Sequence, residues 1–341
     1  MNVLVRAHAW WYNKVPISFA TVLLLLDGRR ASWGGGMALL AVVLTVCAVG
    51  NYGYALNDLF DLDEDARAGR VNAAAGIGVR RSWAIVAASA ACAVAFGALA
   101  AGIIGAAITL LELCLPLAYS VPPLRVKERG WLGVVADALA AHVYPAVLAL
   151  FAVAAWTGRP IGTALAACAV AWSAAAGLRG ILTHLLHTAE RDRRAGLRTI
   201  VDAGALRLER LITALLLPIE LLGFGGMLVL CRVGPVLWIG VALYLAYETF
   251  MTADGRFSVI MFRPSGQRYV PFVEERFYKS WAPLVLALDA ARIDLLYLLA
   301  VPLYVVLFRR HLVNEAVRVR GVMSALRSRA TARGARSNGG S

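Results

Sequence analysis

The sequence predicts an all-α fold, a bundle of about nine membrane-spanning helices. Its 341 residues are 60% hydrophobic and only 16% charged, which is far too apolar for a soluble protein of this size. Apolar stretches of about 17–25 residues, the length that crosses a bilayer, recur along the chain. The predicted spans cover residues 12–27, 36–56, 82–101, 103–121, 132–156, 160–186, 210–231, 234–251 and 284–308.

These spans predict a single transmembrane domain, residues 1–308, followed by a basic and disordered tail, residues 309–341. The net charge of +13 does not indicate a nucleic-acid partner, because the basic residues lie in loops between apolar spans. Loops after the even-numbered spans carry most of them, so we expect those loops to face the cytoplasm. An odd number of spans would then place the arginine-rich tail on the other side, which leaves open whether the count is wrong by one.

Acidic residues crowd the end of the second predicted span. Asn57, Asp61 and Asp65 recur every four residues, so a helix continuing through them would stack an amide and two carboxylates on one face. Carboxylates this close repel one another unless cations lie between them, and Mg²⁺ takes such oxygen ligands. The alternative is a solvated loop. Three further acids lie within the same nine residues: Asp58, Asp63 and Glu64.

A second polar cluster follows the predicted span 160–186. His184, His187, Glu190 and Asp192 lie there among several arginines. Two polar clusters at the same kind of position, each at the end of an apolar helix, predict one shared site.

A basic turn connects the predicted spans 103–121 and 132–156. Its prolines restrict the backbone, and its cations face the same side of the membrane as the acids. The segment reads YSVPPLRVKERG and contains Tyr119, Ser120, Pro122, Pro123, Arg125, Lys127 and Arg129.

Together with NDLFDLDED, this turn resembles the UbiA superfamily of intramembrane prenyltransferases. The family's first motif runs NxxxDxxxD, its YSxPPxRxKxRG segment matches almost letter for letter, and the later DRRAGLRT phrase lies at matching spacing. The resemblance implies a helical bundle around a central cavity, with Mg²⁺ as cofactor, a prenyl diphosphate and a hydrophobic acceptor as partners, and membrane lipid around it. It further implies metal ligands at Asn57, Asp61, Asp65 and Asp192, of which the three aspartates are expected to be catalytic.

The chain departs from the family's pattern at the second motif, which is normally DxxxD. The second Asp falls on Asp192, but the first falls on Thr188. His184 shares a helix face with both positions, whereas Glu190 projects away, so His184 is the better substitute ligand and Glu190 the weaker one. The alternative is that the histidines only form hydrogen bonds between helices.

The cations expected to bind diphosphate come from several segments. Lys14 and Arg179 lie within predicted spans, where a charge is costly unless it is paired or meets an anion. The alternatives are that Lys14 extends to the interface and that Arg179 forms a salt bridge with Asp137 or Glu112. The remaining expected diphosphate ligands are Lys127, Arg129, Arg70 and Arg198.

The predicted activity is Mg²⁺-dependent transfer of a prenyl group from a prenyl diphosphate to an aromatic or other small lipid-soluble acceptor within the membrane. Two other reactions stay open: cyclisation of the prenyl group, as in a terpene cyclase, and attack of a polyprenyl phosphate on an activated sugar phosphate such as a phosphoribosyl donor. A family member that has lost catalysis and a transporter are the non-enzymatic alternatives. We expect an integral protein of a bacterial-type inner (plasma) membrane, with the site loops in the cytoplasm.

Overall fold

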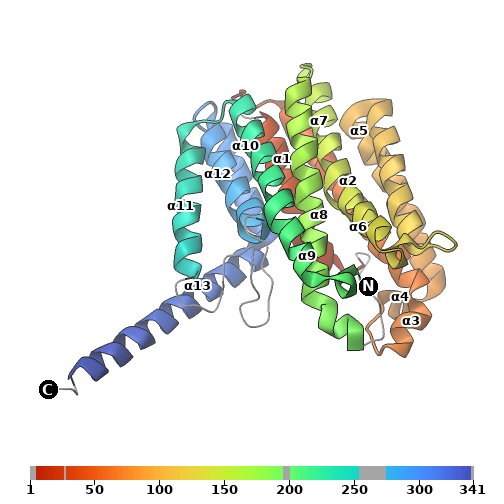
Figure 1. Cartoon of the computed structure of the whole chain (residues 1–341). Helices are drawn as coiled ribbons and strands as arrows, with labels where there is room; N and C mark the ends of the chain where they lie inside the picture. Colours follow the sequence, from red (N-terminus) through yellow and green to blue (C-terminus); the bar gives the residue numbers. More distant parts are fainter. Residues whose placement is uncertain (1–4, 27, 195–199, 253–273, 339–341) are drawn as a thin grey trace.

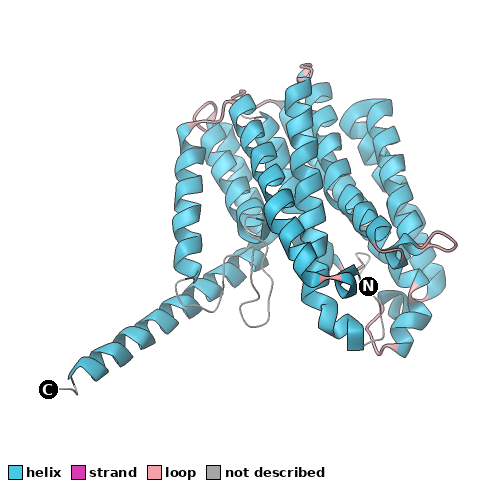
Figure 2. Cartoon of the chain, viewed as in Figure 1, coloured by secondary structure: helices cyan, strands magenta, loops and turns pink. Residues whose placement is uncertain are grey.

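The computed structural model describes residues 5–26, 28–194, 200–252 and 274–338. Helices and short loops make up all of these residues (Figure 2). Among them, six helical stretches are long and apolar enough to cross a membrane, which confirms the all-α membrane bundle but not the count of nine. These stretches are Trp33–Phe60, Val79–Ser120, Trp131–Thr157, Thr163–Glu190, Ala205–Cys231 and Leu295–Ser328.

Helix α1, Ala7–Leu26, lies among the other helices of the bundle (Figure 1). Most of its apolar side chains are buried. Large apolar residues elsewhere stay exposed, such as Ile103 and Leu222, as expected where a helix faces lipid instead of water. The other helices are α2 Trp33–Phe60, α3 Leu62–Arg67, α4 Ala73–Ile77, α5 Val79–Ser120, α6 Trp131–Ala138, α7 Tyr144–Thr157, α8 Thr163–Arg194, α9 Ala205–Leu211, α10 Leu217–Cys231, α11 Pro235–Thr252, α12 Ala282–Ala290 and α13 Ala300–Asn338.

The long helical stretch α5 is a hairpin of two helices. Its backbone leaves the helical conformation at Ala101 and Gly102, where Gly102 has a φ of 59° that favours glycine. The two halves then approach so closely that a Cβ on Gly105 would lie 2.0 Å from the carbonyl oxygen of Gly97. The break falls between the predicted spans 82–101 and 103–121, and small residues on both halves permit the contact.

The predicted single span 284–308 is wrong. Helix α12 ends at Ala290, and after a turn the chain runs back antiparallel to it, so that the Tyr304 hydroxyl donates to the carbonyl oxygen of Lys279. Polar residues in the turn explain the reversal. Asp289 accepts from the backbone N–H of Gly234 at 2.5 Å and pairs with Arg292 at 3.0 Å, which ties the turn to the loop before α11.

This hairpin places the C-terminal extension at the same end of the bundle as the acidic cluster. The Trp11 indole donates to the carbonyl oxygen of Leu307 at 3.1 Å, and Tyr12 stacks on His311. The segment just before them also reaches the end of α2, because Arg6 pairs with Asp58 at 3.0 Å. The arginine-rich extension therefore lies on the side of the other basic loops, which removes the conflict with the charge pattern.

Residues 309–341 were expected to form a disordered tail, but residues 309–338 are helical. They continue α13 beyond a break at Phe308 (φ −117°, ψ 21°) and extend away from the bundle (Figure 1). The division of the chain into a domain of residues 1–308 and a tail stays a prediction.

Candidate functional site

The site begins where α2 ends. The helix stops at Phe60, Asp61 caps it with a non-helical backbone (φ −104°, ψ 7°), and α3 starts at Leu62. The Asn57 side-chain amide donates to Asp61 Oδ2 at 2.9 Å, so these two side chains lie on one face, as their spacing predicts.

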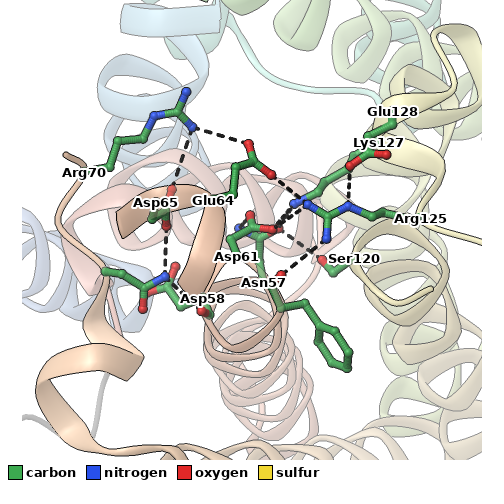
Figure 3. Close-up of polar contacts among 12 residues, drawn as sticks. Asn57, Asp58, Asp61, Glu64, Asp65, Arg70, Ser120, Arg125, Lys127 and Glu128 are labelled. Atoms are coloured by element: carbon green, nitrogen blue, oxygen red, sulfur yellow. Dashed lines mark hydrogen bonds and ion pairs between the residues drawn. The ribbon is translucent and has the colours of Figure 1, made fainter. Parts of the chain in front are cut away.

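Two cations from the turn between α5 and α6 meet this pair. Lys127 Nζ contacts Asp61 Oδ1 and lies 3.4 Å from Asn57 Oδ1. Arg125 Nη2 lies 3.2 Å from Asp61 Oδ1 and 2.7 Å from Glu64 Oε2 (Figure 3). An amide, two carboxylates, an ammonium group and a guanidinium group thus converge at one end of the bundle.

The backbone around Arg125 positions its side chain for this role. Arg125 has a left-handed conformation (φ 33°), and its guanidinium also donates to the carbonyl oxygen of Phe60, at 3.3 Å. Partial burial disfavours its charge, but Glu128, Asp61 and Glu64 outweigh that effect and raise the pKa of Arg125. Arg125 was not among the diphosphate ligands expected from the sequence, although the R-x-K spacing of the turn could have indicated it.

Asp65 belongs to a separate branch of the cluster. Its Oδ2 accepts from the side-chain amide of Asn72 at 2.9 Å, and Arg70 Nη1 lies 3.7 Å from its Oδ1 and 3.9 Å from Glu64 Oε1. The capping turn at Asp61 separates α3 from α2, so the three predicted ligands do not form one uninterrupted stack. Glu64 connects the two branches, because it lies between Arg70 and Arg125 (Figure 3).

Asp58 has a structural role. It is fully buried, pairs with Arg6, and accepts from the backbone N–H of Ala73 at 3.1 Å at the start of α4. It therefore fastens the N-terminal segment and the loop after α3 to α2.

The other predicted diphosphate ligands lie in varied positions. Arg129 is exposed and donates to the carbonyl oxygen of Pro123 at 2.6 Å. Lys14 is half-buried on α1, and Arg198 lies outside the described residues.

Arg179 is buried inside the bundle and forms two hydrogen bonds with Glu220 of α10, at 2.5 Å and 2.7 Å. The salt-bridge partner expected from the sequence was Asp137 or Glu112, but the partner in the structure is Glu220. A guanidinium already paired in this way is not retained in our proposed diphosphate site.

The second predicted cluster lies at the end of α8. Thr188 is buried, and its hydroxyl lies 3.5 Å from the carbonyl oxygen of Leu185 in the same helix. His184 and Glu190 are exposed, and Glu190 pairs with Arg193 at 2.7 Å. The side chain of Asp192 is not among those described, so the shared site stays a prediction.

The oxygen donors at the end of α2 suit Mg²⁺, which needs only one or two carboxylates and completes its shell with water and phosphate. In the described part of the chain, no three His, Cys, Asp or Glu side chains are grouped closely enough to hold a metal by themselves. Lys127 and Arg125 both contact Oδ1 of Asp61. The donors therefore fit a Mg²⁺ ion that is coordinated both by these side chains and by oxygens of a bound phosphate group.

The fold and the site define an integral membrane protein with a cluster of acids and cations at one end of a helical bundle. The chain matches the model of the UbiA prenyltransferase family over residues 15–256 and belongs to this family. The comparison with curated proteins found no match.

Solved structures of UbiA homologues share the fold. One from Archaeoglobus fulgidus, bound to DMAPP and Mg²⁺, has a TM-score of 0.58 at 19% identity, covering 85% of this chain and 96% of that one. The same homologue bound to GPP and Mg²⁺ gives 0.57 at 19% identity, with the same coverage. The apo homologue from Aeropyrum pernix K1 gives 0.57 at 16% identity, covering 86% of this chain and 100% of that one.

Proposed function

We propose that the protein transfers a prenyl group from a prenyl diphosphate to a hydrophobic acceptor within the membrane, and that the reaction depends on Mg²⁺. The observation that carries this proposal is the convergence of Lys127 and Arg125 on Asn57 and Asp61. Solved structures of the A. fulgidus homologue, which shares this fold, are bound to DMAPP or GPP and to Mg²⁺, which supports the proposal.

In the proposed reaction the bond between the allylic carbon and the diphosphate oxygen breaks, and its electron pair leaves with the diphosphate. The acceptor forms a new bond to that carbon and releases a proton. Mg²⁺ bound by Asp61 and Asp65 would neutralise charge on the departing diphosphate. Lys127 and Arg125 would exchange their contacts with Asp61 for contacts with phosphate oxygens, where positive groups stabilise the same developing charge.

The proposed metal ligands are Asn57, Asp61, Asp65 and Asp192. His184 or Glu190 substitutes for the family's Asp at the position of Thr188. Lys127 and Arg125 are the main proposed phosphate ligands. Arg70 serves the Asp65 branch, while Arg129, Arg198 and Lys14 are secondary ligands. We propose that this end of the bundle faces the cytoplasm, because the basic loops and the arginine-rich extension lie on it.

The experiment is an assay of diphosphate release by detergent-purified protein given C10–C20 and longer prenyl diphosphates. Each donor is tested with and without Mg²⁺, and with and without a lipid extract of a host cell. We expect release only when both Mg²⁺ and extract are present, and the prenylated acceptor can then be isolated. Release without extract would support a cyclase or a hydrolase instead, and the absence of release with any donor would contradict the proposal.

A further inference from the structure

The part of α13 that follows the break at Phe308, called the extension here, carries an unusual charge. Eight arginines and a single acid, Glu315, lie between residues 309 and 338, which are helical. A helix of this charge that leaves the bilayer on the side of the basic loops lies close to lipid head groups.

Contacts with the bundle fix the direction in which the extension leaves. His311 Nε2 and Ser280 Oγ lie 2.8 Å apart, and Glu315 accepts from the Tyr247 hydroxyl at 3.0 Å. Glu315 also pairs with Arg318 of its own helix at 2.5 Å and lies 3.5 Å from Arg276, which is buried. The first turns of the extension are therefore held on the ends of neighbouring helices.

The face turned away from these contacts is a regular exposed stripe. Its positions advance by four and three residues in turn, which keeps them on one side of a helix. Arginines and apolar residues share it, and the apolar members Val313 and Met323 are 54% and 40% exposed. Val322 and Ala325, on the other side of the helix, are buried. The stripe consists of Arg309, Val313, Ala316, Arg320, Met323 and Arg327.

We propose that this stripe binds the surface of an anionic bilayer on the side of the membrane where the acidic cluster lies. The apolar side chains would enter the boundary between head groups and acyl chains, while the arginines extend to lipid phosphates. Self-association through the stripe is disfavoured, because a parallel pair of such helices would bring arginines of like charge together. The proposal does not depend on the chemistry of the site.

The test measures amide hydrogen exchange of residues 309–328 in the full-length protein, reconstituted in nanodiscs of phosphatidylcholine with or without phosphatidylglycerol. We expect exchange to be about tenfold slower with the anionic lipid, and high salt to remove most of that protection. A triple variant, R309Q/R320Q/R327Q, should lose it. The matched control R30Q/R159Q/R232Q removes the same charge at the opposite end and should keep it.

Equal exchange in the two lipids, or protection that survives in the triple variant, would overturn the proposal. Protection that rises with the number of protein copies per disc and ignores lipid charge would show self-association and would overturn it as well.

Discussion

Arg125 Nη2 lies 3.2 Å from Asp61 Oδ1, although 64 residues separate them in the sequence. The contact joins the turn after α5 to the end of α2 and brings a permanent positive charge to the proposed metal ligand. Lys127 contacts the same oxygen, so both cations lie where a phosphate group would meet Asp61.

Replacing Asp61 or Asp65 by Asn should abolish Mg²⁺-dependent turnover. Each amide keeps the shape of the side chain but loses the charge that attracts the metal, so we expect the rate of diphosphate release to fall by at least about a hundredfold. The matched control is Asp63→Asn, which alters an exposed acid of the same helix. Near-normal release by D61N or D65N, with normal folding, would remove that residue from the site.

Lys127→Gln should reduce diphosphate release much more than Arg129→Gln does. Lys127 reaches Asp61 and Asn57, whereas Arg129 is exposed and donates to a backbone carbonyl of its own turn. We expect a loss of about a hundredfold for K127Q and a few-fold at most for R129Q. Equal losses in the two variants, measured as kcat/KM for the prenyl diphosphate, would show that Arg129 binds substrate as directly as Lys127.

The pair of Arg179 and Glu220 should matter for stability. Removing one partner leaves a buried charge unpaired, so Glu220→Gln should lower the free energy of unfolding by about 3–5 kcal/mol. Replacing both, as in R179M/E220L, should recover most of that loss because no charge is left buried. Unfolding in a denaturing detergent titration measures the effect. A double variant no more stable than E220Q would contradict this reasoning.

Gly105→Ala should destabilise the α5 hairpin by about 1–3 kcal/mol, because its new methyl group would collide with the backbone of Gly97. Gly225→Ala in α10 is the control, since nothing lies within 4 Å of a Cβ there. The thermal unfolding midpoint compares the two variants. Similar midpoints would mean that the two halves of α5 can separate at little cost.

The sequence predicted the fold class well because apolar length is a direct physical signal in a membrane. It placed the break in α5 correctly, but it missed the reversal after α12, since the turn is short and its flanks are both apolar. Asp289 makes that reversal possible by accepting N–H groups from residues over fifty positions earlier, and no local pattern reports such a contact.

The site was predictable only in part, because local spacing indicates a shared helix face but does not indicate contacts between distant segments. The spacing of Asn57 and Asp61 indicated their common face, but Asp61 ends the helix, so Asp65 turns toward Asn72 instead. Arg179 forms its salt bridge with Glu220 and not with Asp137 or Glu112, the partners expected from the sequence. Such pairing depends on which helices are neighbours in the bundle, which the sequence does not show.

The most direct test of the central claim measures equilibrium binding of a non-reacting prenyl thiodiphosphate to purified wild-type protein, D61N and R129Q, with and without Mg²⁺. We predict that the wild type and R129Q bind it only when Mg²⁺ is present and that D61N does not bind under either condition. Binding that needs no Mg²⁺, or that D61N retains at wild-type affinity, would contradict the claim that the Asp61 cluster holds the metal and the diphosphate.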